Sequence, residues 1–141
     1  MKIYLNKARE NWILDRLRKE WYQYNSDISS KLLINSDLIW IASPWTWKKI
    51  NKSYLKKKKV VCSIYHIDFD KFTDLDISEF KERDAFVDYY HVISENTKLQ
   101  LSSLTTKKII SIPFWINQNN WHYIEDKRKL KNKYKINEKY Y

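Results

Sequence analysis

Apolar positions along the chain recur with two different spacings, and the spacing separates predicted strands from predicted helices. Apolar runs of strand length lie at 2–5, 38–42, 60–65, 89–93 and 109–112. The run at 60–65 is continuous, as in strands that are buried on both faces of a parallel sheet. Helical spacing of four, four and three residues is found instead at Ile13, Leu17, Trp21 and Tyr24, which predicts an amphipathic helix with these side chains on its buried face.

Further helices are predicted between the later strands, at 45 to about 56, at 77–85, after Ser94 and at 121–134. The Ser94 hydroxyl suits a helix N-cap, and Leu101 and Leu104 mark the buried stripe that follows it. Strands that alternate with helices indicate βα units. The chain is therefore predicted to be α/β, with a Rossmann-like, doubly wound, mostly parallel sheet in one domain over 1–141.

Ligands of such sheets bind beyond the carboxyl ends of the strands. The segments that follow the five predicted strands are 6–11, 43–45, 66–71, 94–97 and 113–117. We therefore expect the functional side chains to come mainly from these five segments.

Glycine is absent from all 141 residues, although an average usage of about 7% would place roughly ten glycines in a chain of this length. Phosphate-binding loops of the dinucleotide and P-loop types need glycine for tight turns and for close approach of the backbone. The sequence thus excludes both kinds of loop, and any nucleotide is expected to be held chiefly elsewhere.

A formal charge of +10 suggests contact with nucleic acid or with an anionic membrane surface. Lysine supplies 22 of the 27 basic residues and arginine only five, whereas bidentate recognition of phosphate and guanine favours arginine. An AT-rich genome would also enrich lysine, asparagine, isoleucine and tyrosine without selection for binding. No specific nucleic-acid partner is expected, while peripheral contact with an anionic membrane remains open.

Cysteine and aspartate offer little metal chemistry. Cys62 lies inside an apolar run, which predicts a small buried thiol, and a single cysteine builds neither a disulfide framework nor a cysteine-based zinc site. Asp68, Asp70 and Asp74 lack the glycine and distal glutamate of a calcium loop, so a solvated loop is predicted. No run approaches the ~18 apolar residues of a membrane span, and a cytoplasmic location is expected.

Five segments together carry a resemblance to a known family. They are ENWILDR at 10–16, SPWTW at 43–47, VVCSIYHI at 60–67, DYYHVIS at 88–94 and IPFWIN at 112–117. Their order and spacing resemble the amino-terminal domain of bacterial family 4-like glycosyltransferases, over nearly the whole chain. The absence of glycine departs from relatives that have a glycine-rich first loop.

The resemblance implies one half of a GT-B enzyme, in which two Rossmann-like domains face a cleft. Such enzymes move a hexosyl group from a nucleotide sugar to a glycan, a lipid or another acceptor, here with retention, as in the synthesis of cell-surface polysaccharides. The amino-terminal half shapes the acceptor side, and the carboxy-terminal half holds the nucleotide sugar. Because the sequence stops at Tyr141, where that second half is expected to begin, this chain alone is expected to be inactive, with no metal and no cofactor.

The resemblance also suggests site residues. His66 matches the histidine that the family places beside the transferred sugar, where an imidazole or its backbone carbonyl can stabilise an oxocarbenium-like transition state. Glu10 and Asn11 either bind acceptor hydroxyls or cap the first helix, whose amino end favours anionic groups. Other candidates for acceptor binding are Trp12, Trp45, Lys71, Ser94, Thr97, Trp115 and Asn117.

Tryptophans allow two interpretations, since Trp45, Trp47 and Trp115 can stack on sugar rings or pack in a core. We expect Trp45 and Trp115 to form an exposed apolar patch near His66. His91, inside a predicted strand, is expected to pack or cap.

Two alternatives to a glycosyltransferase half remain at this stage. One is a basic domain that binds nucleic acid or anionic lipid through the lysines at 56–59 and the tail at 127–139. The other is a noncatalytic module that uses the same exposed face as a protein interface.

Overall fold

A computed structural model describes residues 1–11, 13–115 and 126–135 of the chain. Within these ranges five strands form one sheet in which all pairs are parallel. The strands are β1 (Ile3–Leu5), β2 (Leu38–Ile41), β3 (Lys59–Ile64), β4 (Tyr89–Val92) and β5 (Lys108–Ser111), and they lie in the order β1-β2-β3-β4-β5. The predicted α/β class and parallel sheet are confirmed.

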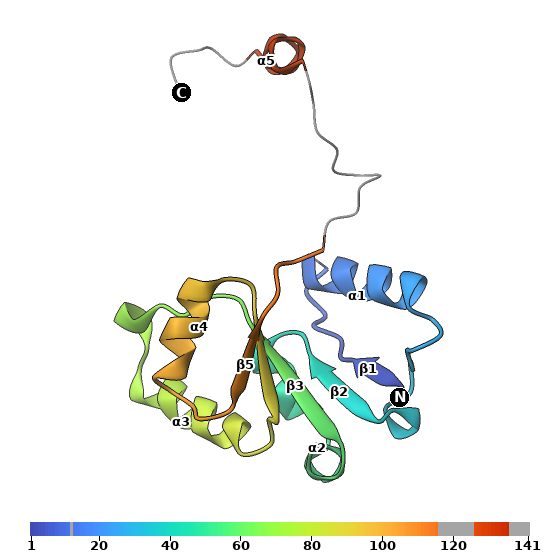
Figure 1. Cartoon of the computed structure of the whole chain (residues 1–141), viewed down its shortest axis with the longest axis vertical. Helices are drawn as coiled ribbons and strands as arrows, with labels where there is room; N and C mark the ends of the chain where they lie inside the picture. Colours follow the sequence, from blue (N-terminus) through green and yellow to red (C-terminus); the bar gives the residue numbers. More distant parts are fainter. Residues whose placement is uncertain (12, 116–125, 136–141) are drawn as a thin grey trace.

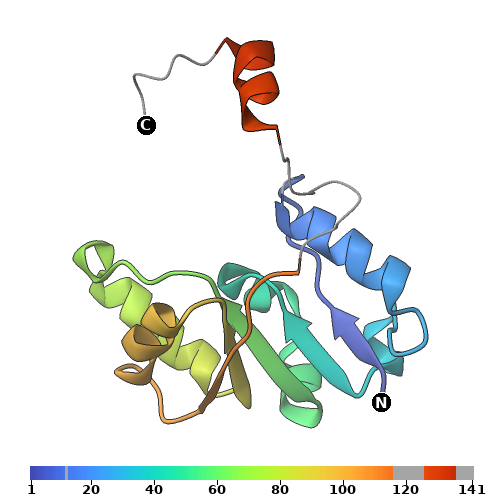
Figure 2. The same cartoon turned by 45° about the horizontal axis from the view of Figure 1, so that its top comes forward.

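Helices connect consecutive strands. The α-helices are α1 (Ile13–Tyr24), α2 (Lys52–Lys57), α3 (Asp74–Asp84), α4 (Glu95–Ser102) and α5 (Lys127–Tyr134), and the 3₁₀-helices are η1 (Leu33–Asn35), η2 (Pro44–Lys49) and η3 (Phe69–Lys71). Figures 1 and 2 both draw α5 away from the sheet. No helix in the described part of the chain has the length and apolar character that crossing a membrane requires.

The main core lies on one face of the sheet. Alternate strand residues such as Ile39, Val60 and Tyr90 are fully buried there, and they meet Trp47 from η2, which is 1% exposed. Phe80 of α3 stacks on Tyr90 with ring centroids 5.8 Å apart. This face is thus covered by η2, α2, α3 and α4, and the burial of Trp47 assigns that tryptophan to the core.

Among the described helices, α1 packs on the opposite face, near β1 and β2 (Figure 1). There Trp21 of α1 packs edge-on against Trp40 of β2, whose neighbours Ile39 and Ile41 point into the main core. All four connections step along the sheet in the same direction, yet the first crosses the face opposite to the others. The β1–α1–β2 connection therefore has the opposite hand from the next one, and the sheet is wound on both faces without a reversal of strand order.

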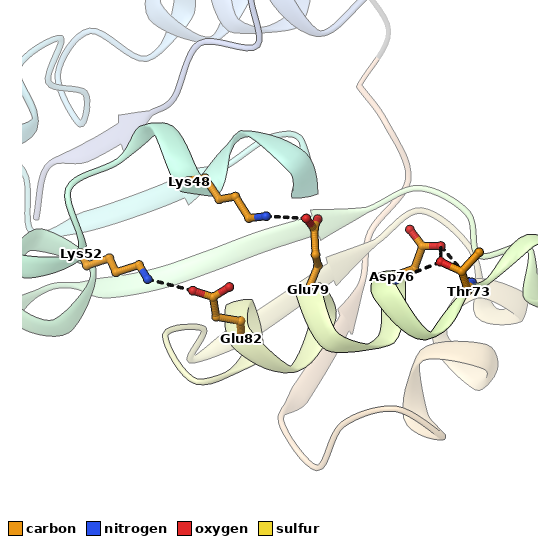
Figure 3. A network of polar contacts seen from close by, with 6 residues as sticks. All are labelled: Lys48, Lys52, Thr73, Asp76, Glu79 and Glu82. Carbon is orange, nitrogen blue, oxygen red and sulfur yellow. Dashed lines mark hydrogen bonds and ion pairs between the residues drawn. The ribbon is translucent and has the colours of Figure 1, made fainter.

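Two predicted helices have different bounds in the structure. The helix expected at 45–56 is divided into η2 and α2, because Asn51 caps α2 by accepting a hydrogen bond from the Ser53 amide over 2.9 Å. The helix expected at 77–85 starts earlier, at Asp74. There Thr73 and Asp76 form a reciprocal capping box (Figure 3).

The buried stripe predicted for α1 is wrong at its end, because Tyr24 is 61% exposed. Leu17 is buried as predicted, Leu14 is buried beside it, and Glu20 follows them at 8% exposure. Glu20 is held inside because its Oε2 accepts a hydrogen bond from Nε1 of Trp115 over 3.3 Å. A partner 95 residues away thus turns a charged residue inward, which the apolar spacing could not predict.

Candidate functional site

His66 follows β3 at the carboxyl edge of the sheet and is exposed, as predicted. It lines an open pocket of about 190 Å³ together with Trp45, whose side chain is 56% exposed. Polar residues of α3 form part of the wall, namely Asp76, Glu79 and Arg83. Sequence reasoning missed these three because they lie on a helix rather than in a loop that follows a strand.

Both carboxylates of this wall have partners on one oxygen. Oε1 of Glu79 forms an ion pair with Nζ of Lys48, and Oδ2 of Asp76 accepts hydrogen bonds from the amide and hydroxyl of Thr73 (Figure 3). The hydroxyl and amide of Thr73 lower the pKa of Asp76. Asp76 is therefore a carboxylate at neutral pH, and it retains a second oxygen to accept hydrogen bonds.

A crevice is expected between β1 and β2, because their connections leave toward opposite faces. Asn6 follows β1 at this position. The amide nitrogen of its side chain donates to Oγ1 of Thr46, and its Oδ1 accepts from the Ala42 backbone over 2.9 Å. Asn6 is 3% exposed, so it acts as a buried tie between the two loops.

The loop after β1 is wrapped around the carboxylate of Asp15. Backbone amides of Arg9, Glu10 and Asn11 donate to it over 3.2, 2.7 and 3.0 Å. Burial acts to raise the pKa of Asp15, but the three amides together lower it. Arg9 and Asn11 have positive φ angles of 65° and 54°, a conformation that favours glycine. Three amides of the loop before α1, where the sequence predicts a preference for anionic groups, are thus occupied by the chain's own carboxylate.

Glu10 has a buried Oε1 without a hydrogen-bond partner among the described residues, and Oγ of Ser43 is in the same condition. Burial raises the pKa of Tyr65, and the nearby charge of Glu10 adds to this effect. The Tyr65 hydroxyl donates to the carbonyl of Ala42 over 2.6 Å. Glu10 therefore lies close to the carboxyl ends of β2 and β3.

Three other predicted residues have local structural contacts. Ser94 caps α4 and accepts from the Thr97 amide over 3.2 Å, as expected, and the two hydroxyls lie 2.9 Å apart. Thr97 is 4% exposed, and its Oγ1 lies 3.4 Å from the carbonyl of Tyr65. Lys71 in η3 is exposed and pairs with Asp68 over 2.8 Å. Of these three residues, only Lys71 presents an exposed side chain.

Trp115 lies in a different place from the predicted patch. It packs with Trp21 and Trp40 on the face that α1 covers, beside an apolar groove of about 360 Å³ that His91 also lines. Trp45, by contrast, lies with His66 in the pocket beyond β3. The expected patch of Trp45 and Trp115 near His66 is therefore wrong, because the two indoles line separate cavities.

Trp12 and Asn117 lie outside the described residues. Across 1–11, 13–115 and 126–135, no three His, Cys, Asp or Glu side chains are arranged to hold a metal ion. Cys62 is buried as predicted, and burial raises the pKa of its thiol to about 12.

Comparisons with known proteins add no relative. No protein-family model matches the chain, and no curated protein or solved structure shows significant similarity to it.

Proposed function

We propose that the chain forms the acceptor-side half of a GT-B glycosyltransferase, which transfers a hexosyl group from a nucleotide sugar to a glycan or another acceptor. The pocket beyond β3 carries the proposal, because Trp45, His66 and the carboxylates of Asp76 and Glu79 line it together. An exposed indole can stack on the C–H face of a sugar ring. Carboxylates accept hydrogen bonds from sugar hydroxyls.

The size of the pocket supports an acceptor rather than a whole nucleotide sugar. Its volume of about 190 Å³ is below the ~300–1,000 Å³ of pockets that enclose drug-sized ligands, and it suits a group as large as one sugar ring. The chain also has no glycine with which to build a phosphate-binding loop. We therefore assign the nucleotide to a second domain, and we expect this chain alone to bind an acceptor without transferring sugar.

His66 is the proposed electrostatic stabiliser of the transferred sugar. Its imidazole is exposed in the pocket and makes no hydrogen bond to another residue in the described part of the chain. Charge that develops on a glycosyl ring in an oxocarbenium-like transition state is stabilised by a polar group held nearby. In a two-domain enzyme built on this half, His66→Ala is expected to lower turnover about 10²-fold.

Binding of simple glycosides to the full chain tests the proposal. A panel of methyl hexosides and short glycans is screened by saturation-transfer difference NMR. We expect at least one of these sugars to show a signal that reports binding to the chain. Trp45→Ala should abolish this signal, whereas Tyr24→Ala, at another exposed aromatic residue, should leave it unchanged. Absence of any ligand, or a ligand that is indifferent to Trp45→Ala, would refute a sugar site in this pocket.

A second candidate function is attachment to an anionic membrane, and one surface specifically favours it. At the amino edge of the sheet a hollow of about 600 Å³ is lined by Lys56, Lys57, Lys58, Lys59 and Lys107. Nζ of Lys58 donates to the carbonyl of Ile34 over 3.2 Å, which brings the exposed Leu32 and Ile34 close to this hollow. Lysines beside protruding apolar side chains are typical of contact with anionic lipid.

Vesicle sedimentation tests this attachment. Vesicles of phosphatidylcholine with phosphatidylglycerol should bind the chain, and vesicles of phosphatidylcholine alone should not. Lys56→Gln with Lys57→Gln should weaken binding about 25-fold, at about fivefold for each lysine. The same charge change at Lys127 and Lys129 is the control, and equal losses in both pairs would show that net charge rather than this edge is responsible.

A further inference from the structure

Arg83 of α3 is a buried cation at the pocket that contains His66. Its side chain is 8% exposed, and its Nε is buried without a hydrogen-bond partner among the described residues. Its guanidinium carbon lies 5.0 Å from the centre of the Phe80 ring, which offers a cation–π contact but no hydrogen-bond acceptor. No carboxylate of a described residue forms an ion pair with it.

Three carboxylates of the same helix have other partners. Glu79 pairs with Lys48, and Glu82 pairs with Lys52 over 2.8 Å (Figure 3). Asp76 is engaged in the capping box with Thr73. These three acidic residues are therefore partly neutralised by other groups, whereas no described residue supplies a counter-ion to the buried guanidinium.

An unpaired buried charge is costly, and proteins normally provide a partner for it. A guanidinium is also the group that best matches the two oxygens of a carboxylate or phosphate. We propose that this pocket binds a sugar that carries a carboxylate or phosphate group, with Arg83 as the counter-ion and Trp45 beneath the ring. The inference rests on the proposed function for the sugar ring, while the anionic group rests on Arg83 alone.

Affinity measurements on the full chain test the anionic group. Methyl glucoside, methyl glucuronide, glucose 6-phosphate and inorganic phosphate are titrated separately, with tryptophan fluorescence and calorimetry as readouts. We expect a charged sugar to bind about tenfold to a hundredfold more tightly than methyl glucoside, as for hydrogen bonds to a charged group. Comparing the affinity for methyl glucuronide with that for glucose 6-phosphate shows whether the pocket prefers a carboxylate or a phosphate group.

Arg83→Leu should remove this preference and retain the affinity for methyl glucoside. The variant should fold with an equal or higher thermal midpoint, because leucine replaces an unpaired buried charge. Arg16→Leu, which removes an exposed arginine on α1, is the matched control and should keep the preference.

The outcomes separate the two proposals. Equal affinity of the wild type for charged and neutral sugars would overturn the anionic site and leave the sugar pocket standing. Phosphate binding that is lost in Arg83→Leu, with no binding of methyl glucoside, would support the anionic site and refute the sugar pocket. A preference that survives in Arg83→Leu would overturn the role of Arg83.

Discussion

Ser63 and His91 lie directly opposite each other on β3 and β4, with Oγ of Ser63 2.9 Å from Nδ1 of His91. Nε2 of His91 lies 2.8 Å from the carbonyl oxygen of Ile112, so Nε2 must be the protonated nitrogen and Nδ1 the acceptor. Nε1 of Trp40 donates to the same Ser63 hydroxyl over 2.8 Å. Every partner in this series is satisfied when the imidazole is neutral.

The pH dependence of stability should reflect this neutral histidine. Burial lowers the pKa of His91, although the bond to Ile112 acts to raise it. The unfolded chain therefore binds a proton more readily, near its ordinary pKa of about 6.5, and stability falls as the pH falls below that value. We expect the urea midpoint of the wild type to drop more than that of His91→Gln between about pH 7 and pH 5.5.

His66→Gln is the control for this experiment, because His66 is exposed and forms no hydrogen bond with another described residue. That variant should retain the pH dependence of the wild type. If His91→Gln kept the same slope as the wild type, His91 would not be the titrating group.

Asp15 should contribute strongly to stability at neutral pH. Asp15→Asn removes the negative charge of a carboxylate that accepts hydrogen bonds from three backbone amides. We expect this change to lower the free energy of unfolding in urea by about 1–3 kcal/mol. Because the folded pKa of Asp15 is lowered, its contribution is complete above the ordinary value of about 3.9 and disappears as the pH falls through the folded pKa. The difference between wild type and variant should therefore shrink in acid, and a constant difference would contradict an ionic origin.

Arg9 should accept glycine without loss of stability. Its φ of 65° costs a residue with a Cβ atom about 1–2 kcal/mol, and glycine would remove this cost. The greater freedom of glycine in the unfolded chain would offset about 0.4–1 kcal/mol of that stabilisation. Arg9→Gly should therefore be neutral or stabilising in urea unfolding. Lys19→Gly, inside α1, should instead cost about 1 kcal/mol. Similar losses at both positions would mean that Arg9 is not strained.

Cys62 should react with thiol reagents only when the chain unfolds. The thiol is fully buried, and burial raises its pKa to about 12, so the reactive thiolate is scarce at neutral pH. We expect labelling by iodoacetamide to be slow in buffer and fast in urea, with the same midpoint as the fluorescence transition. Because Cys62 is the single cysteine, mass spectrometry can follow the reaction at one site. Rapid labelling of the native protein would place the thiol at the surface.

The strands and their places along the chain were predictable from the sequence. Buried parallel strands form short apolar runs, and these runs differ clearly from the helical spacing of the segments between them. The ends of helices were less predictable. The Thr73 capping box starts α3 at Asp74, three residues before the predicted start at residue 77, and Asn51 separates η2 from α2 where the spacing predicted one helix. In both cases a short polar side chain, rather than hydrophobicity, sets the boundary.

The candidate site was predictable where it follows a strand and unpredictable where it comes from a helix. His66 and Trp45 were found because they lie just beyond β3 and β2. Arg83 was missed, since a charged residue on a helix is normally solvated and only the fold shows that it is buried. The separation of Trp45 from Trp115 depends on which face each indole joins, and the sequence does not encode that choice locally.

The agreement between strand order and chain order has a consequence for synthesis. As the nascent chain leaves the ribosome, each new strand finds its neighbour already made, and no strand has to wait for a partner encoded further downstream. Only the leading edge, β5 at the end of the sheet, is added last. The sheet can thus grow in one direction with a single unpaired growing edge, which limits the time during which emerging segments are open to aggregation.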